Sequence, residues 1–132
     1  MNLLLDTHLF LWFIAGDSRL PKPIERAVRE PMNRVYLSVA AVWECVIKVQ
    51  IGRLVLPGAP VEYLPRRRAE HGIDTLPIVE EDLATLATLP LLHRDPFDRI
   101  VIAQAVRHDF TMATLDERVP AYAAHGLRIL KA

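Results

Sequence analysis

The sequence has a single cysteine, Cys45, among its 132 residues. One thiol cannot form an intramolecular disulfide, which excludes the disulfide frameworks of small secreted proteins and favours the reducing cytoplasm. In its apolar surroundings we expect Cys45 to be buried and inert. The sequence also has no glycine-rich phosphate loop and no nucleophile elbow, which excludes two common kinds of nucleotide-binding and acyl-transfer site.

Charge of one sign is not in excess, because sixteen Lys and Arg residues balance sixteen Asp and Glu residues. Net charge therefore supplies no general attraction to nucleic acid, and any such contact must come from a local patch. The apolar N-terminal run is interrupted by Asp6 and His8 and has no basic residue before it. This run is a poor signal peptide and too short to span a membrane, so we expect a soluble, cytoplasmic protein without membrane contact.

Apolar residues, in contrast, are abundant. Hydrophobic residues make up 52% of the chain and charged residues 24%, at a length that suits one globular domain over residues 1–132. Apolar strand-like segments alternate with helical patterns, which predicts an α/β fold with a central parallel sheet and helices on both faces. We expect strands at 2–6, 35–38, 75–78, 111–114 and 127–130, and a short extended piece at 53–56. We expect helices at 7–15, 22–30, 39–51, 81–89 and 95–108, and we expect residues 66–71 to belong to a further helix that ends at Gly72.

Four acidic residues stand beside these apolar segments: Asp6, Glu44, Asp98 and Asp116. Two of them, Asp6 and Asp116, stand at the carboxyl ends of expected strands, and the other two lie within two turns of expected helix starts. Sites in parallel sheets form at the carboxyl ends of strands, so these side chains can reach one crevice. Several unpaired carboxylates cannot be buried together unless a cation or protons neutralise them. The pattern therefore indicates a divalent metal site.

Each acid also has a structural explanation. Asp95 suits a helix N-cap, Pro96 the first helical position, and Asp98 the third position of a capping box. The two roles are compatible, and we assign Asp95 to the cap and Asp98 to the metal. Glu44 precedes Lys48 by four residues, the order of a helical ion pair worth roughly 0.2–0.5 kcal/mol, but its apolar neighbours argue against a fully solvated pair.

The remaining acids have similar alternatives. Asp6 is either a helix N-cap or a ligand, because it follows three leucines and precedes a threonine. Asp116, taken alone, would be interpreted as the cap of a helix starting near residue 117. The five histidines show no paired zinc spacing, so we give none of them a metal-binding role.

Four segments, residues 4–8, 38–44, 93–105 and 114–116, carry a resemblance to a known family. They read Leu-Leu-Asp-Thr-His, Ser-Val-Ala-Ala-Val-Trp-Glu, His-Arg-Asp-Pro-Phe-Asp-Arg-Ile-Val-Ile-Ala-Gln-Ala and Thr-Leu-Asp. In this order, over essentially the entire chain, the sequence resembles PIN domains and, more narrowly, the VapC-type ribonuclease toxins of bacterial toxin–antitoxin pairs. The resemblance implies a PIN-like three-layer sandwich. None of the four acids is replaced, which argues against an inactive copy.

The resemblance also implies a chemistry and a set of partners. The four acids would hold one or two Mg²⁺ or Mn²⁺ ions, some through water, and RNA would be hydrolysed without a covalent intermediate. Thr7 would be an accessory residue at this site. Arg94 and Arg99 flank the acid-bearing helix start and are expected to contact backbone phosphates. A small cognate antitoxin of the VapB type would occupy a groove and block the site, and the toxin would be a homodimer.

Two other hypotheses stay open. A receiver-type Mg²⁺-binding signalling module would need an acid pair after the first strand, where Asp6 stands alone, and a lysine after the last main strand, where only Lys131 near the end of the chain is found. A non-catalytic interaction protein would use the acids only as a binding platform. Metal-dependent RNA cleavage separates the first hypothesis from these two.

Overall fold

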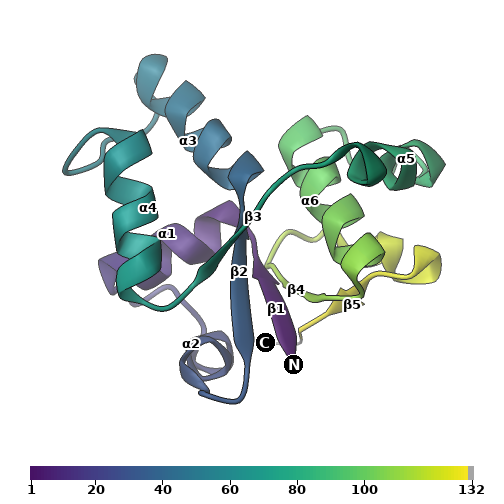
Figure 1. Ribbon diagram of the computed structural model, residues 1–132, viewed down its shortest axis with the longest axis horizontal. Helices are drawn as coiled ribbons and strands as arrows, with labels where there is room; N and C mark the ends of the chain where they lie inside the picture. Colours follow the sequence, from purple (N-terminus) through teal and green to yellow (C-terminus); the bar gives the residue numbers. More distant parts are fainter. Residues whose placement is uncertain (131–132) are drawn as a thin grey trace.

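The computed structural model describes residues 1–130, in which helices cover both sides of a five-stranded parallel sheet (Figure 1). The strands are β1 (Asn2–Leu5), β2 (Arg34–Ser38), β3 (Asp74–Leu76), β4 (Thr111–Ala113) and β5 (Arg128–Ile129). The helices are α1 (Thr7–Ala15), α2 (Lys22–Arg29), α3 (Val39–Gln50), α4 (Pro60–Glu70), α5 (Glu80–Thr88), α6 (Pro96–His108) and the 3₁₀ helix η1 (Pro120–His125). The expected α/β class and its parallel sheet are confirmed.

Strand β1 lies at the centre of the sheet, and its leucines are buried on both faces. Leu3 and Leu5 pack into one hydrophobic core, whereas Leu4 packs into the other. This division follows from the two-residue period of a strand, which points successive side chains to opposite faces. An uninterrupted leucine run is therefore what a central strand covered on both faces requires.

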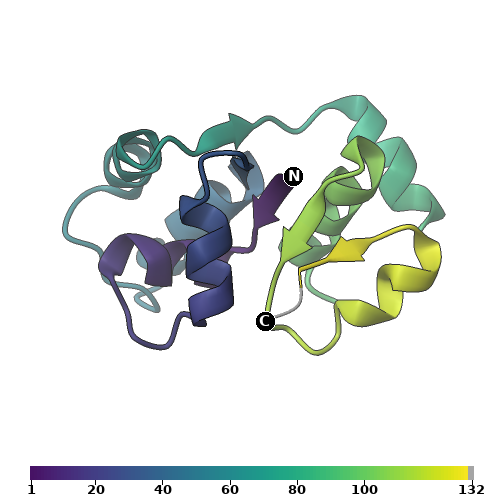
Figure 2. The same ribbon diagram turned by 90° about the horizontal axis from the view of Figure 1, so that it is seen from below.

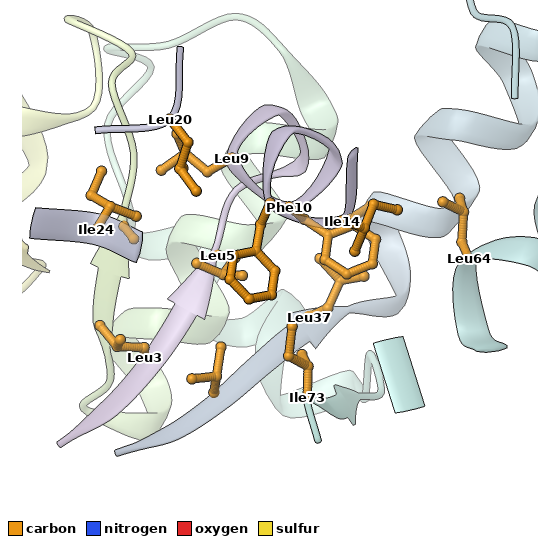
Figure 3. Packing of buried hydrophobic residues seen from close by; sticks show 14 of the residues in the cluster. Leu3, Leu5, Leu9, Phe10, Ile14, Leu20, Ile24, Leu37, Leu64 and Ile73 are labelled. Atoms are coloured by element: carbon orange, nitrogen blue, oxygen red, sulfur yellow. The ribbon is translucent and has the colours of Figure 1, made fainter. Parts of the chain in front are cut away.

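The two cores lie on opposite sides of the sheet. Figure 3 shows the first, in which side chains of α1 and α2 meet those of β1 and β2. In the second, residues of α6, together with Tyr122 of η1, pack against the other face. Figure 2 shows the same separation from below, with α5, α6 and η1 on one side and α1, α2 and α4 on the other. The neighbouring residues Ala40 and Ala41 of α3 join different cores, so α3 begins where the two layers meet.

The strand order β3-β2-β1-β4-β5 creates a topological switch point between β1 and β4. From β1 the chain builds the sheet outwards through β2 and β3, and it returns to add β4 and β5 on the other side. The backbone N–H of Asp6 still donates to the carbonyl of Ala113 at 3.1 Å, so the two strands stay paired up to their carboxyl ends. Binding sites of parallel sheets form at such a point.

Two segments add detail to the expected pattern. The extended piece expected at 53–56 is not a strand of the sheet, and the helix to which residues 66–71 were expected to belong is α4, which begins at Pro60 and ends at Glu70. Pro60 stands in the first turn, where its missing N–H costs nothing, and buried Leu64 anchors the helix in spite of Pro65 in its interior. Lys131, considered above for a receiver-type module, lies outside the described residues. No helix within residues 1–130 combines the length and apolar character needed to cross a bilayer.

Candidate active site

A pocket of about 410 Å³ lies at the switch point, and all four acids singled out in the sequence line it. Asp6 follows β1 and Asp116 follows β4, while Glu44 comes from α3 and Asp98 from the first turn of α6. Strand ends and helix starts therefore meet at one hollow, as the topology requires. The full lining is Asp6, Thr7, His8, Leu9, Trp12, Glu44, Lys48, Asp95, Asp98, Leu115, Asp116 and Arg118.

Asp6 has two roles at this pocket. It is the N-cap of α1, with extended backbone and with Oδ1 accepting a hydrogen bond from the Leu9 N–H at 2.8 Å. Capping of this kind typically stabilises a protein by about 1 kcal/mol. The carboxylate also lines the pocket, so cap and ligand are not alternatives for this residue.

Glu44 is buried and is held by two neighbours. The Thr7 hydroxyl donates to Oε1 at 2.8 Å, and the Lys48 ammonium contacts Oε2 at 2.5 Å. The expected helical ion pair with Lys48 is therefore present, but the Glu44 side chain is only 9% exposed. Hydrogen bonding and pairing compensate for the removal of this carboxylate from water.

At the start of α6, Asp95 caps the helix and the Asp98 carboxylate takes no part in the cap. Asp95 Oδ1 accepts hydrogen bonds from the backbone N–H groups of Phe97 at 2.8 Å and Asp98 at 3.1 Å. The expected capping box does not close, because the N–H of Asp95 donates to His93 rather than to the Asp98 carboxylate. The Asp98 side chain consequently faces the pocket, with 27% of its surface exposed.

Asp116 caps no regular helix; it forms a turn and an ion pair instead. Oδ1 accepts the backbone N–H of Arg118 at 2.9 Å, and the Arg118 guanidinium reaches both carboxylate oxygens, at 3.1 and 3.0 Å. The next helical segment, η1, begins only at Pro120. Arg118 also lines the pocket and was not singled out from the sequence.

His93 is the second residue that the sequence analysis missed. Its side chain is completely buried, and Nε2 lies 2.8 Å from Asp116 Oδ2 and 3.1 Å from Asp98 Oδ2. The histidines were judged only by the paired spacing typical of zinc ligands, and His93 has no second histidine at such a spacing. A usable signal was its place five residues before Asp98 and two residues before the helix cap Asp95.

The carboxylates of the pocket differ in their pKa values. Burial raises the pKa of Asp98 to about 6, and the neighbouring carboxylates add to this effect. Burial likewise raises the pKa of Asp6, against the hydrogen bonds that it accepts. Burial alone would also raise the pKa of Asp116, but hydrogen bonds from Arg118 and His93 outweigh it and hold the pKa below its usual range. A bound cation would favour the charged forms of Asp6 and Asp98.

The donor set fits a hard divalent cation. Mg²⁺ and Mn²⁺ take oxygen ligands, and Mg²⁺ commonly keeps several waters beside one or two carboxylates. One atom each from His93, Asp98 and Asp116 lies within 4.8 Å of the others. Asp6 and Glu44 line the same pocket but stand outside this close group.

The two arginines expected at phosphates lie elsewhere. The Arg99 guanidinium donates to the carbonyl of Leu89 at 3.0 Å, and Arg94 is exposed. Neither is part of the pocket lining, whereas Lys48 and Arg118 are. The site therefore contains basic side chains from α3 and from the loop after β4.

A second hollow of about 680 Å³ adjoins the acidic pocket. The two share Thr7, His8 and Trp12 of α1 and Lys48 of α3 in their linings. The lining of the second hollow is largely apolar. It includes Leu11, Leu54, Val55, Leu56, Pro57 and Tyr63.

Comparison with known proteins identifies the family. The family model of the PIN domain matches residues 3–125. Ribonuclease VapC22 of Mycobacterium tuberculosis is 30% identical over 124 residues, which cover 92% of each protein. The chain therefore belongs to the PIN domain family. Within that family it is of the VapC type.

Solved structures agree on the fold. A structure of VapBC-1 from nontypeable Haemophilus influenzae matches with a TM-score of 0.71 at 15% identity, covering 99% of this chain and 98% of the other. FitAcB from Neisseria gonorrhoeae matches with a TM-score of 0.63 at 21% identity, covering 98% and 96%. At these identities the likeness establishes the shared architecture.

Proposed function

We propose that the protein is a Mg²⁺- or Mn²⁺-dependent endoribonuclease that acts as the toxin of a toxin–antitoxin pair. One observation carries the proposal: of the four acids singled out in the sequence, two pair with a lysine or arginine and two do not. Lys48 pairs with Glu44 and Arg118 with Asp116. Among the described residues, neither Asp6 nor Asp98 forms an ion pair with a lysine or arginine, although both line the pocket.

A buried acid with a purely structural role looks different in this protein. Asp82, in the first turn of α5, is fully buried and is paired with the Arg107 guanidinium at 2.6 Å. Its second oxygen accepts the backbone N–H of Val79 at 2.9 Å. Asp6 and Asp98, in contrast, line an open pocket without a lysine or arginine partner among the described residues, which supports a ligand that is itself a cation.

In this proposal Asp98 and Asp116 would hold the ion, and Asp6 and Glu44 would contribute their carboxylates from the lining of the same pocket. A bound Mg²⁺ or Mn²⁺ would supply the Lewis acid and the acidified water that phosphodiester hydrolysis needs. Thr7 keeps Glu44 in place through its hydroxyl. Hydrolysis would proceed without a covalent intermediate, as the resemblance to PIN nucleases implies.

RNA would be bound through its phosphates at the rim of the pocket. Arg118, 63% exposed in its side chain, and Lys48 both line the pocket and can contact a phosphate. Arg94 is exposed one residue before the α6 cap and keeps its proposed phosphate role. Arg99 is a weaker candidate for a phosphate contact than Arg94, because its guanidinium already donates to the carbonyl of Leu89.

The receiver-type alternative is disfavoured by the topology. Receiver modules have the flavodoxin-like strand order 2-1-3-4-5. Here the order is 3-2-1-4-5, and Asp6 is the single acid directly after β1. A non-catalytic interaction domain could have the same acidic pocket. It would cleave no RNA when the metal is bound, and this difference separates it from the proposed nuclease.

The test is cleavage of a mixed pool of cellular RNA by the purified protein. Cleavage should require Mg²⁺ or Mn²⁺, stop on addition of EDTA and resume with excess Mg²⁺. Asp98→Asn should abolish cleavage. Asp109→Asn is the matched control, because Asp109 ends the same helix with a φ of 58°, a conformation that asparagine adopts readily. Cleavage that persists in EDTA, or in Asp98→Asn, would exclude the proposed mechanism.

The biological setting is part of the proposal. Residues 1–132 would form one cytoplasmic domain that dimerises and is neutralised by a VapB-type antitoxin. The apolar hollow beside the acidic pocket supports this, because an antitoxin segment lying along Leu11 and Tyr63 would reach Lys48 at the site. Expression of the protein alone should slow bacterial growth, Asp98→Asn should relieve this effect, and Asp109→Asn should not. Equal toxicity of both variants would contradict the proposal.

A further inference from the structure

His93 has an unusual position for a residue outside the expected acidic set. It lies in the loop between α5 and α6, its side chain has no exposed surface, and its imidazole stands between two carboxylates and a backbone amide. Nε2 faces Asp98 and Asp116, whereas Nδ1 lies 3.1 Å from the backbone nitrogen of Asp95. The two ring nitrogens therefore have different partners.

The partner of Nδ1 fixes the position of the ring proton. The backbone N–H of Asp95 donates to Nδ1, so Nδ1 offers a lone pair and carries no proton. The ring proton then lies on Nε2, which donates to Asp116 Oδ2 at 2.8 Å with Asp98 Oδ2 3.1 Å away. A nitrogen that carries a proton has no lone pair for a metal.

We infer that His93 is a positioning residue that acts through an Nε2–H donor, holding the Asp116 and Asp98 carboxylates together for the cation, and is not a metal ligand itself. This inference rests on the proposed metal-dependent function. It separates His93 from the two carboxylates, although the three residues lie within one ion's reach of each other. Metal-binding carboxylates are commonly oriented by hydrogen bonds from such outer residues.

The loop that carries His93 is built to hold the ring still. The buried Tyr122 hydroxyl accepts the backbone N–H groups of Leu92 and His93, each at 3.0 Å, and donates to the carbonyl of Pro90 at 2.7 Å. Arg99 holds the preceding carbonyl, that of Leu89. With its backbone fixed at these points and Nδ1 fixed by Asp95, the imidazole has one orientation in which to meet the carboxylates.

The proton position can be measured directly on the unaltered protein. Long-range ¹H–¹⁵N correlation spectra of ¹⁵N-labelled protein show which ring nitrogen of a histidine is protonated, and His93→Gln identifies the His93 signals. We expect the proton on Nε2, both without metal and with saturating Mg²⁺. A proton on Nδ1 in the Mg²⁺-loaded protein, with Nε2 turned to the ion, would overturn the inference.

Variants test whether the donor matters to the ion. His93→Gln keeps an N–H donor close to the place of Nε2, whereas His93→Met fills the space without a donor. Mn²⁺ affinity, measured by calorimetry in the absence of RNA, should stay within a few fold of the wild type for His93→Gln and fall about 10–100-fold for His93→Met. Equal losses in both variants would identify an imidazole ligand and overturn the inference.

These measurements are separate from the test of cleavage. A protein that binds Mn²⁺, shows the Nε2 proton and cleaves no RNA would overturn the proposed function and leave the role of His93 intact. A protein that cleaves RNA with the proton on Nδ1 would overturn the role of His93 alone. Failure to bind either Mg²⁺ or Mn²⁺ would overturn both. If His93→Met does not fold, the spectra of the wild-type protein still decide the matter.

Discussion

The hydroxyl of Thr7 donates a hydrogen bond to Glu44 Oε1 at 2.8 Å, which ties the first residue of α1 to the middle of α3. Both residues are 7% exposed, and the second oxygen of Glu44 is bound by Lys48. The charge of Glu44 is thus compensated within the protein. This arrangement contrasts with Asp98, which faces the pocket without a basic lysine or arginine partner among the described residues.

We predict that Thr7→Val lowers the free energy of unfolding by about 1–3 kcal/mol, because it leaves a buried carboxylate oxygen without its donor. Thr7→Ser keeps the hydroxyl and should lose much less. Urea unfolding of the metal-depleted proteins measures the difference. Equal stability of Thr7→Val and Thr7→Ser would mean that the hydrogen bond contributes nothing measurable.

Asp6→Asn separates the cap from the charge. Asparagine caps helices about as well as aspartate, so the contact with Leu9 survives. Burial raises the pKa of Asp6, so the folded protein is destabilised when this carboxyl ionises. The stability of the protonated form is therefore present below about pH 4 and is lost as the pH rises. We therefore predict that Asp6→Asn melts above the wild type at neutral pH without metal.

The same variant should respond weakly to metal. At a Mg²⁺ concentration of about a hundred times the dissociation constant, the wild type should gain roughly 2.7 kcal/mol of stability. Asp6→Asn should lose most of this gain, together with cleavage. Thermal melts with and without Mg²⁺ provide the comparison, and Asp109→Asn is again the control. An undiminished Mg²⁺ response would place Asp6 outside the metal site.

Asp98 should make the metal-free protein less stable as the pH rises. Its pKa is raised from 3.8 to about 6 by burial and by the nearby carboxylates. This raised pKa means that the contribution of protonated Asp98 to stability is complete below about pH 4 and is lost as the pH rises through about 6. After allowance for its partial exposure, we expect a loss of about 1–2 kcal/mol. Asp98→Asn cannot ionise and should lack this loss, which urea unfolding across this pH range would reveal.

The fold and the acidic pocket could be predicted from the sequence because each rests on a local rule. The leucine run before Asp6 indicates a strand covered on both faces, and Asp95 with Pro96 marks the start of a helix. Carboxyl ends of parallel strands then bring Asp6 and Asp116 together. These inferences need only periodicity, capping and the geometry of parallel sheets.

What could not be predicted depends on contacts between distant segments. The role of His93 depends on its contact with Asp116, 23 residues away, and on the hydrogen bond from its backbone N–H to the Tyr122 hydroxyl. Arg99 follows the acid that it was expected to assist, but its guanidinium reaches back to the end of α5. Charge and sequence neighbourhood suggested a phosphate contact, whereas the direction of a side chain on a helix decides what it meets.

Arg94 and Arg99 provide the last prediction, because they are separated by only five residues and have different surroundings. Arg94 is exposed, and Arg94→Gln should leave stability within about 0.5 kcal/mol of the wild type. If Arg94 contacts a phosphate, RNA binding should weaken about equally across sequences, and the dependence of affinity on salt should become shallower. Arg99→Gln should instead lower the free energy of unfolding by about 1–3 kcal/mol, because the Leu89 carbonyl loses a charged donor. Urea unfolding and RNA binding at several salt concentrations, both on the metal-free proteins, measure the two effects. A shallower salt dependence for Arg99→Gln at unchanged stability would restore Arg99 to the phosphate-binding role expected from the sequence.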